Sequence, residues 1–343
     1  MTDLHAPIAA GSFDHLVAMS DDIGTFEHAE FAEARREHGY CTDDMARLLV
    51  VMVREPHADP ELLRLGRVAF RFLADAQGVT GKVRNRRAAG GRWQDRRGVG
   101  DCWGRTVWAF GTAARLAPEW WMRQSELSYF DHGITSRSTW PRAMAFAALG
   151  ADEVLAIVPD HYGARRLLTD AIATIGPPGS RADWPWPQPR LSYANAVLSE
   201  ALVVAGDRLA RPDVTENGLN LLRWLLARET VDGHLSPTPA GGADVHDRLQ
   251  RFDQQPIEVA SMADACARAA AVTGEAEWLR GIEMAARWFE GDNDVRLSMW
   301  DPVTGGCYDG LEPAGQNLNQ GSESTIALIS TFQHARALAA APT

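Results

Sequence analysis

The chain is poor in cysteine and has no apolar run long enough to cross a membrane. Four cysteines are scattered over 343 residues, and none forms a close pair with a histidine at the spacing of a metal site. We expect them to be small packing residues near helix ends, although Cys41 and Cys102 could also line a pocket. No basic segment followed by an apolar one begins the sequence, which predicts a soluble, cytoplasmic protein.

Positive charge is also scarce. The sequence has 34 lysines and arginines against 45 aspartates and glutamates, a formal net charge of -11. Such a chain repels phosphate backbones and anionic lipids, so we expect neither nucleic acid nor a membrane surface as a partner. Hydrophobic residues make up 45% of the chain, which is enough for a globular core.

One unit recurs along the chain, in which a polar and often acidic loop leads into a helix that is apolar on most sides. Residues 251–264 are an example, because Asp253 precedes Pro256, which the first helical turn tolerates, and Glu258 follows within that turn. Helices of this kind should begin near Thr42, Asp101, Trp140, Ser192, Pro256 and Asn319. One-sided amphipathic segments lie between them, at 61–77, 119–130, 161–175, 217–228 and 275–289.

A repeat of roughly 50 residues from end to end predicts one closed array of helices. We expect a single domain over 1–343, with 1–11 as a loose tail and 12–36 as a helical segment that closes the ring against the last helix. The connections are long and partly hairpin-like at 78–100, 176–190, 231–255 and 300–310. Ordered loops of this length are uncommon unless they build a site, so we expect them at one face of the array.

Carboxylates gather at the expected helix starts. Asp43 and Asp44 head the first inner helix, Asp101 the second, Glu258 the fifth and Glu323 the sixth. Opposite axes of a six-helix ring lie roughly 16–20 Å apart, which leaves opposed carboxyl groups roughly 6–10 Å apart. Inverting glycosidases separate their acid and base by roughly 6.5–9.5 Å. Asp101 and Glu258 are therefore the first candidates for a catalytic pair. The next candidates, either as catalytic groups or as partners of sugar hydroxyls, are Asp43, Asp44, Asp253 and Glu323.

Residues that suit a hydroxyl-rich ligand lie near these carboxylates. Sugar faces stack on aromatic rings, and sugar hydroxyls pair with charged and amide groups. The candidate contacts are His38, Tyr40, Arg47, Trp93, Trp103, Arg105, Trp140, Trp186, Tyr193, Asn195, Asp253, Gln254, Gln255, Asp309, Asn319 and Gln320. Trp93 and Trp103 could equally be core residues, and Asp43 with Arg47 could be only a helix start with an ion pair. No metal-ligand set or cofactor motif stands out.

Four segments resemble a known group of proteins. They are HGYCTDDMAR at 38–47, GDCWGRTVWA at 100–109, FDQQPIE at 252–258 and NQGSEST at 319–325. They are similar to bacterial proteins described as glycosyltransferase-associated, and the helix alternation resembles the (α/α)6 toroid of six-hairpin glycosidases. The resemblance implies an all-α toroid and carbohydrate chemistry, with mannose-containing oligosaccharides among the candidate substrates. It also implies a functional association with a glycosyltransferase or a glycoside phosphorylase.

The first interpretation is an inverting, metal-independent glycoside hydrolase without a cofactor. A sugar 2-epimerase normally relies on paired histidines, whereas the loop histidines, such as His38 and His132, do not repeat from helix to helix. A phosphorylase or lyase could use the same ring. A non-catalytic oligosaccharide-binding module or glycosyltransferase scaffold would need the aromatic and amide groups, but not several converging carboxylates.

Overall fold

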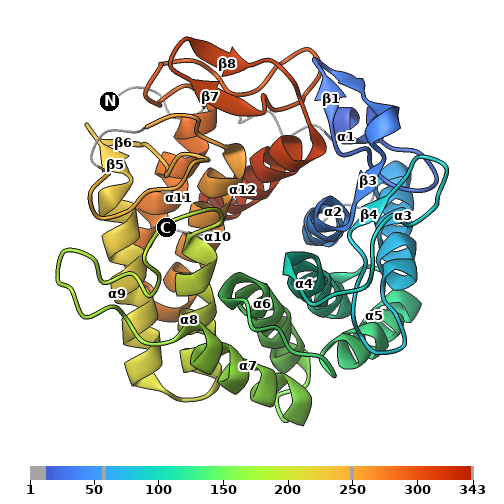
Figure 1. Ribbon diagram of the computed structural model, residues 1–343, viewed down its shortest axis with the longest axis horizontal. Coiled ribbons are helices and arrows are strands. Elements are labelled where there is room, and N and C mark those ends of the chain that lie inside the picture. Colours follow the sequence, from blue (N-terminus) through green and yellow to red (C-terminus); the bar gives the residue numbers. More distant parts are fainter. Residues whose placement is uncertain (1–12, 56–58, 248–250, 341–343) are drawn as a thin grey trace.

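Two concentric rings of helices make up the protein (Figure 1). The computed structural model describes residues 13–55, 59–247 and 251–340. The inner helices are α2 (Thr42–Arg54), α4 (Asp101–Leu116), α6 (Pro141–Ile157), α8 (Ala196–Arg208), α10 (Pro256–Thr273) and α12 (Ser322–Ala340). Each packs against the next, and α12 packs against α2, so the inner ring is closed. The predicted all-α (α/α)6 toroid is thus confirmed.

Outer helices alternate with the inner ones along the chain. They are α1 (Asp14–Ala18), α3 (Pro60–Ala76), α5 (Trp120–Gly133), α7 (Tyr162–Ile175), α9 (Pro212–Arg228) and α11 (Ala276–Phe289). Their apolar residues lie on one side: α3 buries Leu65 and Phe72 and exposes Arg67 and Arg71. Within the described segments, no helix combines the length and the apolar character that a membrane span requires.

Helices α4 and α6 approach each other closely, because glycines lie in their contact. A Cβ atom at Gly111 would lie 2.2 Å from the carbonyl oxygen of Gly150, and one at Gly104 would lie 2.1 Å from that of Ala143. Only residues without a side chain fit at these two positions. Backbone-to-backbone packing therefore sets the width of the ring here.

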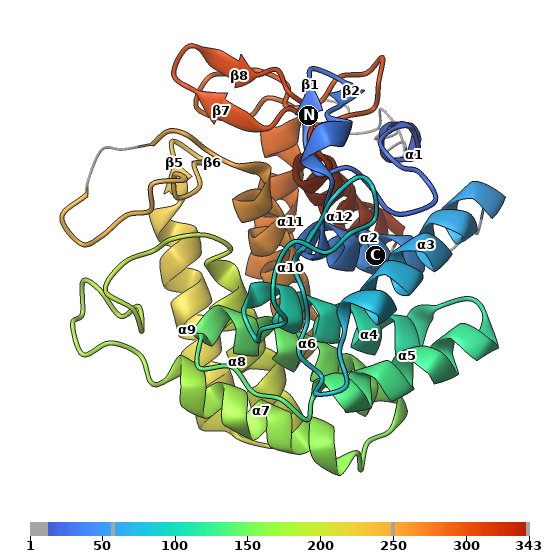
Figure 2. The same cartoon turned by 45° about the vertical axis from the view of Figure 1, so that its right-hand side comes forward.

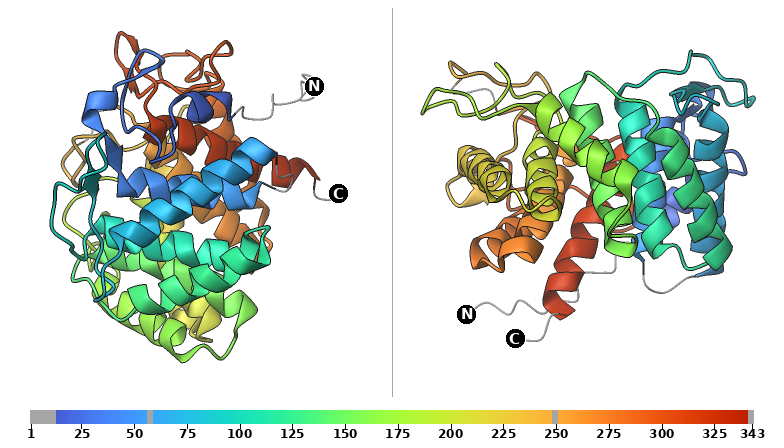
Figure 3. Two further views of the ribbon diagram at one scale, coloured as in Figure 1. Left: turned by 90° about the vertical axis from the view of Figure 1, so that its right-hand side faces the viewer. Right: turned by 90° about the horizontal axis from the view of Figure 1, so that it is seen from below.

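The connections that precede the inner helices lie together at one face of the ring (Figures 2 and 3). Among the residues that the structure describes, they contain four antiparallel pairs of short strands and one 3-10 turn (Arg36–His38). The pairs are β1 (Ala29–Glu30) with β2 (Glu33–Ala34), β3 (Tyr40–Cys41) with β4 (Arg86–Arg87), β5 (Thr230–Val231) with β6 (His234–Leu235), and β7 (Gly310–Glu312) with β8 (Gly315–Asn317). The β3–β4 pair matches Cys41 with Arg86, and it thereby joins the first helix start to the 78–100 loop.

The N-terminal segment differs from its prediction. The sequence predicts a helical segment over 12–36, but helix α1 ends at Ala18. The Oδ1 atom of Asp21 accepts hydrogen bonds from the N–H groups of Ile23 (2.8 Å) and Gly24 (3.1 Å), which stabilises a turn instead of a helix. Helix α1 still packs against α12, as predicted. The predicted tail over 1–11 lies outside the described residues.

Buried ion pairs, which were not predicted, link three inner helices deeper in the ring. Arg268 on α10 lies 3.1 Å from Asp152 Oδ2 and 3.6 Å from Glu200 Oε1, and it also pairs with Glu153. These acids come from α6 and α8. The pairs tie α6, α8 and α10 together.

Candidate functional site

A cavity of about 740 Å³ opens at the face where the inner helices begin. All six inner helices contribute to its wall, through their first turns or through the residues just before them. The predicted site residues that line it are Asp43, Asp44, Arg47, Asp101, Arg105, Trp140, Tyr193, Asp253, Gln255, Asp309 and Glu323. Seven carboxylates and three arginines are part of the wall, so it carries a surplus of negative charge.

Arg47 joins two acidic residues of the wall. Its Nη1 donates to Glu323 Oε2 at 2.6 Å, and its Nη2 donates to Asp44 Oδ1 at 2.9 Å. Burial raises the pKa of Asp44 to about 7 against the opposing effect of Arg47, and Glu323 and Glu27 add to the rise. Burial alone would also raise the pKa of Glu323, but Arg47 and Arg105 together lower it. The two arginines therefore favour the ionised form of Glu323.

Two donor groups of Arg105 lack a hydrogen-bond partner among the described residues. Its Nε lies 3.4 Å from Asp43 Oδ1, and its guanidinium carbon lies 4.3 Å from the centre of the Phe146 ring. The Nε and Nη1 atoms are buried and have no hydrogen-bond partner among the described residues. A buried, unsatisfied donor is costly, so a bound hydroxyl or carbonyl oxygen would stabilise this side chain.

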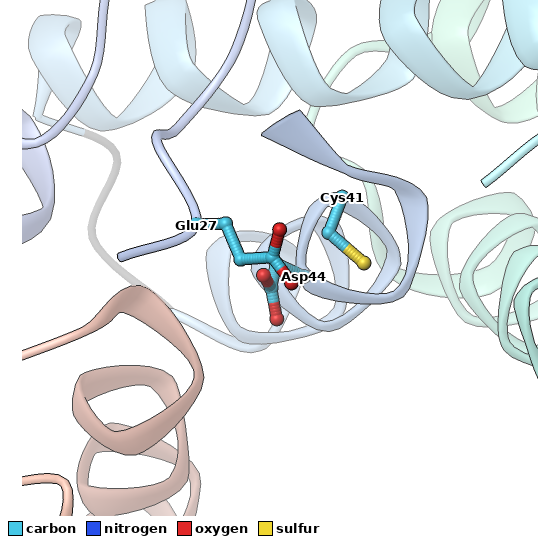
Figure 4. A group of neighbouring side chains, drawn as sticks. All are labelled: Glu27, Cys41 and Asp44. Atoms are coloured by element: carbon cyan, nitrogen blue, oxygen red, sulfur yellow. The ribbon is translucent and has the colours of Figure 1, made fainter. Parts of the chain in front are cut away.

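Glu27, Cys41 and Asp44 form a compact group of potential metal ligands (Figure 4). Their ligand atoms all lie within 4.8 Å of one another. Both carboxylates already have cationic partners, because Arg86 pairs with Glu27 and Arg47 pairs with Asp44. Burial raises the pKa of the Cys41 thiol well above its ordinary value, and Asp44 raises it further. The group therefore fits a metal ion poorly, because two guanidinium groups would have to leave.

Asp253 lies in a different environment. It precedes α10 and packs against Gly310, where a Cβ atom would come within 2.5 Å of its Oδ1. That oxygen is buried and, within the described chain, has no hydrogen-bond partner. Burial raises the pKa of Asp253, and Glu312 and Asp309 raise it further. Burial also raises the pKa of Asp309, against the hydrogen bond that Gly321 N–H donates to its Oδ1 at 2.8 Å.

Asp101 and two aromatic residues form another part of the wall. The Tyr193 hydroxyl donates to Asp101 Oδ2 at 2.7 Å. Burial raises the pKa of Tyr193 to about 12, and Asp101 contributes to the rise, so the phenol keeps its proton and remains a donor. Tyr193 is 45% exposed and Trp140 is 65% exposed. Exposed rings of this kind are available to stack on a sugar.

Glu258 does not line the cavity, although it was predicted to face Asp101. It lies under the turn before α8, where its Oε1 accepts from Ala194 N–H and its Oε2 accepts from Asn195 N–H at 3.3 Å and from Asn195 Nδ2 at 3.2 Å. Burial raises the pKa of Glu258 to about 8, and Glu229 adds to the rise. Asn195, a predicted sugar contact, is likewise buried in this network.

Four predicted aromatic contacts lie outside the wall. Trp103 is a core residue whose Nε1 donates to the carbonyl oxygen of Gly133 at 3.0 Å. Trp186 is buried and stacks on Trp224 with ring centres 5.9 Å apart. Tyr40 is buried against Phe26 and Phe72, and Trp93 packs on Phe72. These four rings therefore pack or form hydrogen bonds within the protein and do not contact the cavity, as they were predicted to do.

Four predicted polar contacts stabilise loops instead. Gln254 is buried, and its Nε2 donates to Asp294 Oδ2 at 2.6 Å. Gln320 accepts from the Thr304 hydroxyl at 2.6 Å, and Asn319 Oδ1 accepts from Phe31 N–H at 3.0 Å. His38 lies outside the wall and is exposed, with its Nδ1 3.1 Å from His28 Nδ1.

Five polar residues of the wall were not predicted. They are Glu27, His28, Arg86, Asn317 and Ser324. Glu27 and His28 belong to a segment that was expected to be helical, and Arg86 reaches the wall through the β3–β4 pairing. The signal in the sequence was indirect: the 78–100 loop is long and polar, and Ser324 follows Glu323 directly.

Comparison with known proteins identifies relatives of the fold. The chain matches no model of a protein family, and no curated protein matches it in sequence. Among solved structures it is similar to a sugar epimerase from a ruminal bacterium, with a TM-score of 0.71, 12% identity, and coverage of 94% of this chain and 95% of that one. It is also similar to an α-amylase from Clostridium perfringens (TM-score 0.61, 11% identity, 96% and 99% covered). A third is a cellulase of C. cellulolyticium in complex with cellobiose (TM-score 0.60, 8% identity, 91% and 87% covered). At these identities the likeness shows a shared six-hairpin fold.

Proposed function

We propose that this protein is a carbohydrate-active enzyme and, more narrowly, an inverting glycoside hydrolase that acts on a neutral oligosaccharide. One observation carries the proposal: two carboxylates of the cavity have contrasting environments. Burial and neighbouring acids raise the pKa of Asp253, whereas Asp101 accepts a hydrogen bond from Tyr193 that stabilises a carboxylate. Contrasting environments of this kind separate a catalytic acid from a catalytic base.

The positions of these two residues in the ring support their pairing. Asp101 begins the second inner helix, and Asp253 precedes the fifth, so they approach the cavity from opposite sides. Asp253 thereby takes the role that the sequence analysis gave to Glu258. Opposed carboxyl groups in such a ring lie roughly 6–10 Å apart, and inverting enzymes need roughly 6.5–9.5 Å to admit a water molecule.

The proposed reaction is a single displacement. Protonated Asp253 donates its proton to the glycosidic oxygen as the bond from that oxygen to the anomeric carbon breaks. The Asp101 carboxylate accepts a proton from a water molecule whose oxygen attacks the anomeric carbon from the opposite face. The products are a sugar with inverted anomeric configuration and the leaving alcohol. Arg105 and Glu323 would bind sugar hydroxyls, and Trp140 would stack on a sugar ring.

The charge of the wall favours a neutral substrate. Seven carboxylates face three arginines, and Arg47 and Arg86 are already paired with acids of the wall. A uronic acid, a sugar phosphate or a free phosphate would be repelled, which argues against a phosphorylase. Four further points stay predictions from the sequence. They are mannose as a constituent of the substrate, an association with a glycosyltransferase or a phosphorylase, independence of metals, and a cytoplasmic location.

A sugar 2-epimerase is the second candidate. It is favoured by the neighbouring histidines His28 and His38 and by the three sugar epimerases among the similar solved structures. Their Nδ1 atoms are 3.1 Å apart, so each ring occupies a nitrogen of the other, and of the two only His28 lines the cavity. We therefore rank this function below hydrolysis.

A panel of manno- and gluco-oligosaccharides of different linkages, followed by proton NMR of the anomeric signals, tests the proposal. The wild-type protein should release a sugar whose first detectable anomer is inverted relative to the bond cleaved. Asp101→Asn and Asp253→Asn should each lower kcat/KM by roughly 100-fold or more, because each removes one proton transfer.

Asp160→Asn is the matched control, because Asp160 is exposed and follows the far end of α6. It should leave the rate unchanged. Release of the retained anomer would refute the inverting mechanism, and near-wild-type rates in both cavity variants would refute the residue assignment. Conversion of a free sugar without change of mass would establish the epimerase, and tight binding without turnover would establish a binding module.

A further inference from the structure

The turn before α8 has a strained backbone next to the cavity. Ala194 has a φ of 43°, which L-residues other than glycine seldom adopt. A conformation of this kind persists only where the surrounding structure holds it. The preceding residue, Tyr193, is part of the cavity wall, so whatever holds the turn also sets the position of Tyr193.

Glu258 holds the turn from α10. Its two carboxyl oxygens bind the successive N–H groups of Ala194 and Asn195, the second at 3.3 Å, and the side-chain amide of Asn195 at 3.2 Å. Glu258 is buried, so water does not compete for these hydrogen bonds. A carboxyl group from another helix thus fixes the backbone of the turn at two consecutive positions.

Arg142 holds the same turn from α6. Its Nη2 donates to Asn195 Oδ1 at 3.0 Å, its Nη1 donates to Gln188 Oε1 at 3.0 Å, and its Nε donates to the carbonyl oxygen of Tyr193 at 2.5 Å. Its guanidinium carbon also lies 4.9 Å from the centre of the Tyr193 ring. Arg142 therefore contacts both the backbone and the ring of Tyr193.

We infer that Glu258 and Arg142 are positioning residues, which hold the strained turn so that the Tyr193 hydroxyl stays 2.7 Å from Asp101 Oδ2. The hydrogen bond fixes one oxygen of Asp101 and leaves the other to accept the proton of the attacking water. The inference rests on the proposed function in giving Asp101 the role of base. The geometry that it assigns to Tyr193 can be tested without any substrate.

The phenol of Tyr193 reports on this geometry. Burial and Asp101 raise its pKa to about 12, because ionisation would place a second negative charge beside the carboxylate. If the turn relaxes and Tyr193 moves into solvent, its pKa should fall toward the ordinary value of about 10. Its state of ionisation at alkaline pH therefore distinguishes a held turn from a relaxed one.

The test is an NMR titration of protein labelled with 13C at tyrosine Cζ, from pH 8 to 10.5, with Tyr193→Phe to assign the signal. Wild-type Tyr193 should stay protonated throughout, whereas Glu258→Gln and Arg142→Lys should show a midpoint near pH 10. Glu229→Gln is the control, since Glu229 is another buried acid that accepts from Thr238 N–H at 3.0 Å. It should titrate like wild type. Arg142→Lys keeps the charge and gives the result if Glu258→Gln does not fold.

A Tyr193 signal that stays protonated in the folded Glu258 and Arg142 variants would overturn the inference. A midpoint near pH 10 in the Glu229→Gln variant would also overturn it, because general loosening of the structure would then explain the change. On a hydrolysed substrate, Glu258→Gln should lower kcat more than it changes KM. If no substrate is hydrolysed but the titration shifts as expected, the positioning role holds and only the hydrolase proposal fails.

Discussion

Two arginines of the same cavity wall should differ strongly in their importance for stability. Arg47 is 7% exposed and pairs with Asp44 and Glu323, whereas Arg86 is 47% exposed and pairs with Glu27. Removal of one partner from a buried ion pair costs about 3–5 kcal/mol, because the other charge stays buried without compensation. Glu27 is only 13% exposed, but the Arg86 side chain is about half in solvent. Because solvent screens a pair of this kind, we expect loss of Arg86 to cost about 1 kcal/mol. Arg47→Met should therefore destabilise the protein several times more than Arg86→Met.

These free energies translate into melting temperatures. An entropy of unfolding of about 2.1 cal/mol/K per residue gives roughly 0.7 kcal/mol/K for a chain of 343 residues. Arg47→Met should then lower Tm by about 4–7 °C, and Arg86→Met by about 1 °C or less. Differential scanning calorimetry at pH 7.5, with the wild type alongside, measures both shifts. Asp44→Asn combined with Arg47→Met should recover part of the loss, because it removes the stranded charge.

The loss in Arg47→Met should also depend on pH. In the wild type Arg47 helps to lower the pKa of Glu323, and a lowered folded-state pKa gives stability that is present above the unfolded-state pKa and disappears as the pH falls. Without Arg47, only Arg105 is left as an arginine that opposes the effect of burial on Glu323, so the pKa of Glu323 should rise. The pKa of Asp44, which burial already raises, should rise further. The variant therefore loses stability as the pH rises. The difference in Tm should therefore grow from pH 5 to pH 8. Equal shifts for the two arginine variants, or a difference independent of pH, would refute this reasoning.

The fold was accessible from the sequence because it is a repeat. Six polar helix starts alternate with one-sided amphipathic segments, and each alternation predicts one hairpin of the ring. The N-terminal segment was predicted wrongly, because its apolar spacing suits a helix but Asp21 binds the backbone of a turn. Side-chain hydrogen bonds of this kind act over two or three residues and override periodicity.

The site was only partly accessible, because pairings distant in sequence build it. Asp43, Asp101 and Glu323 were found from their places at helix starts. Arg86 was missed because it reaches the wall only through pairing with Cys41. Trp186 was predicted to contact the ligand, because the sequence does not reveal that Trp224 stacks on it.

The position of Glu258 could not be read from helix periodicity. The sequence predicts that α8 is entered through residues 192–195, but the positive φ of Ala194 makes this stretch a turn, and the helix begins at Ala196. The N–H groups of the turn bind the Glu258 carboxyl group, whereas Asp253, five residues earlier in the loop before α10, lines the cavity. The conformation of the turn before α8 thus accounts for the burial of Glu258, and periodicity does not reveal it.

Two further predictions concern the packing of the ring. Glu126 is fully buried, its oxygens have no hydrogen-bond partner among the described residues, and burial raises its pKa well above the ordinary value. Its contribution to stability is therefore lost as the pH rises, so calorimetry should show that Glu126→Met raises Tm, and more at pH 8 than at pH 5. An unchanged Tm at both pH values would contradict the inference that the buried, unpaired carboxyl group of Glu126 destabilises the fold. Gly111→Ala should lower Tm by about 1–4 °C, the effect of roughly 1–3 kcal/mol of overpacking, because its Cβ atom would lie 2.2 Å from the carbonyl oxygen of Gly150. Gly90→Ala, whose Cβ atom meets nothing within 4 Å, should have no effect. Equal melting temperatures for the two glycine variants would mean that α4 and α6 can separate without loss, and that their close contact does not hold the ring together.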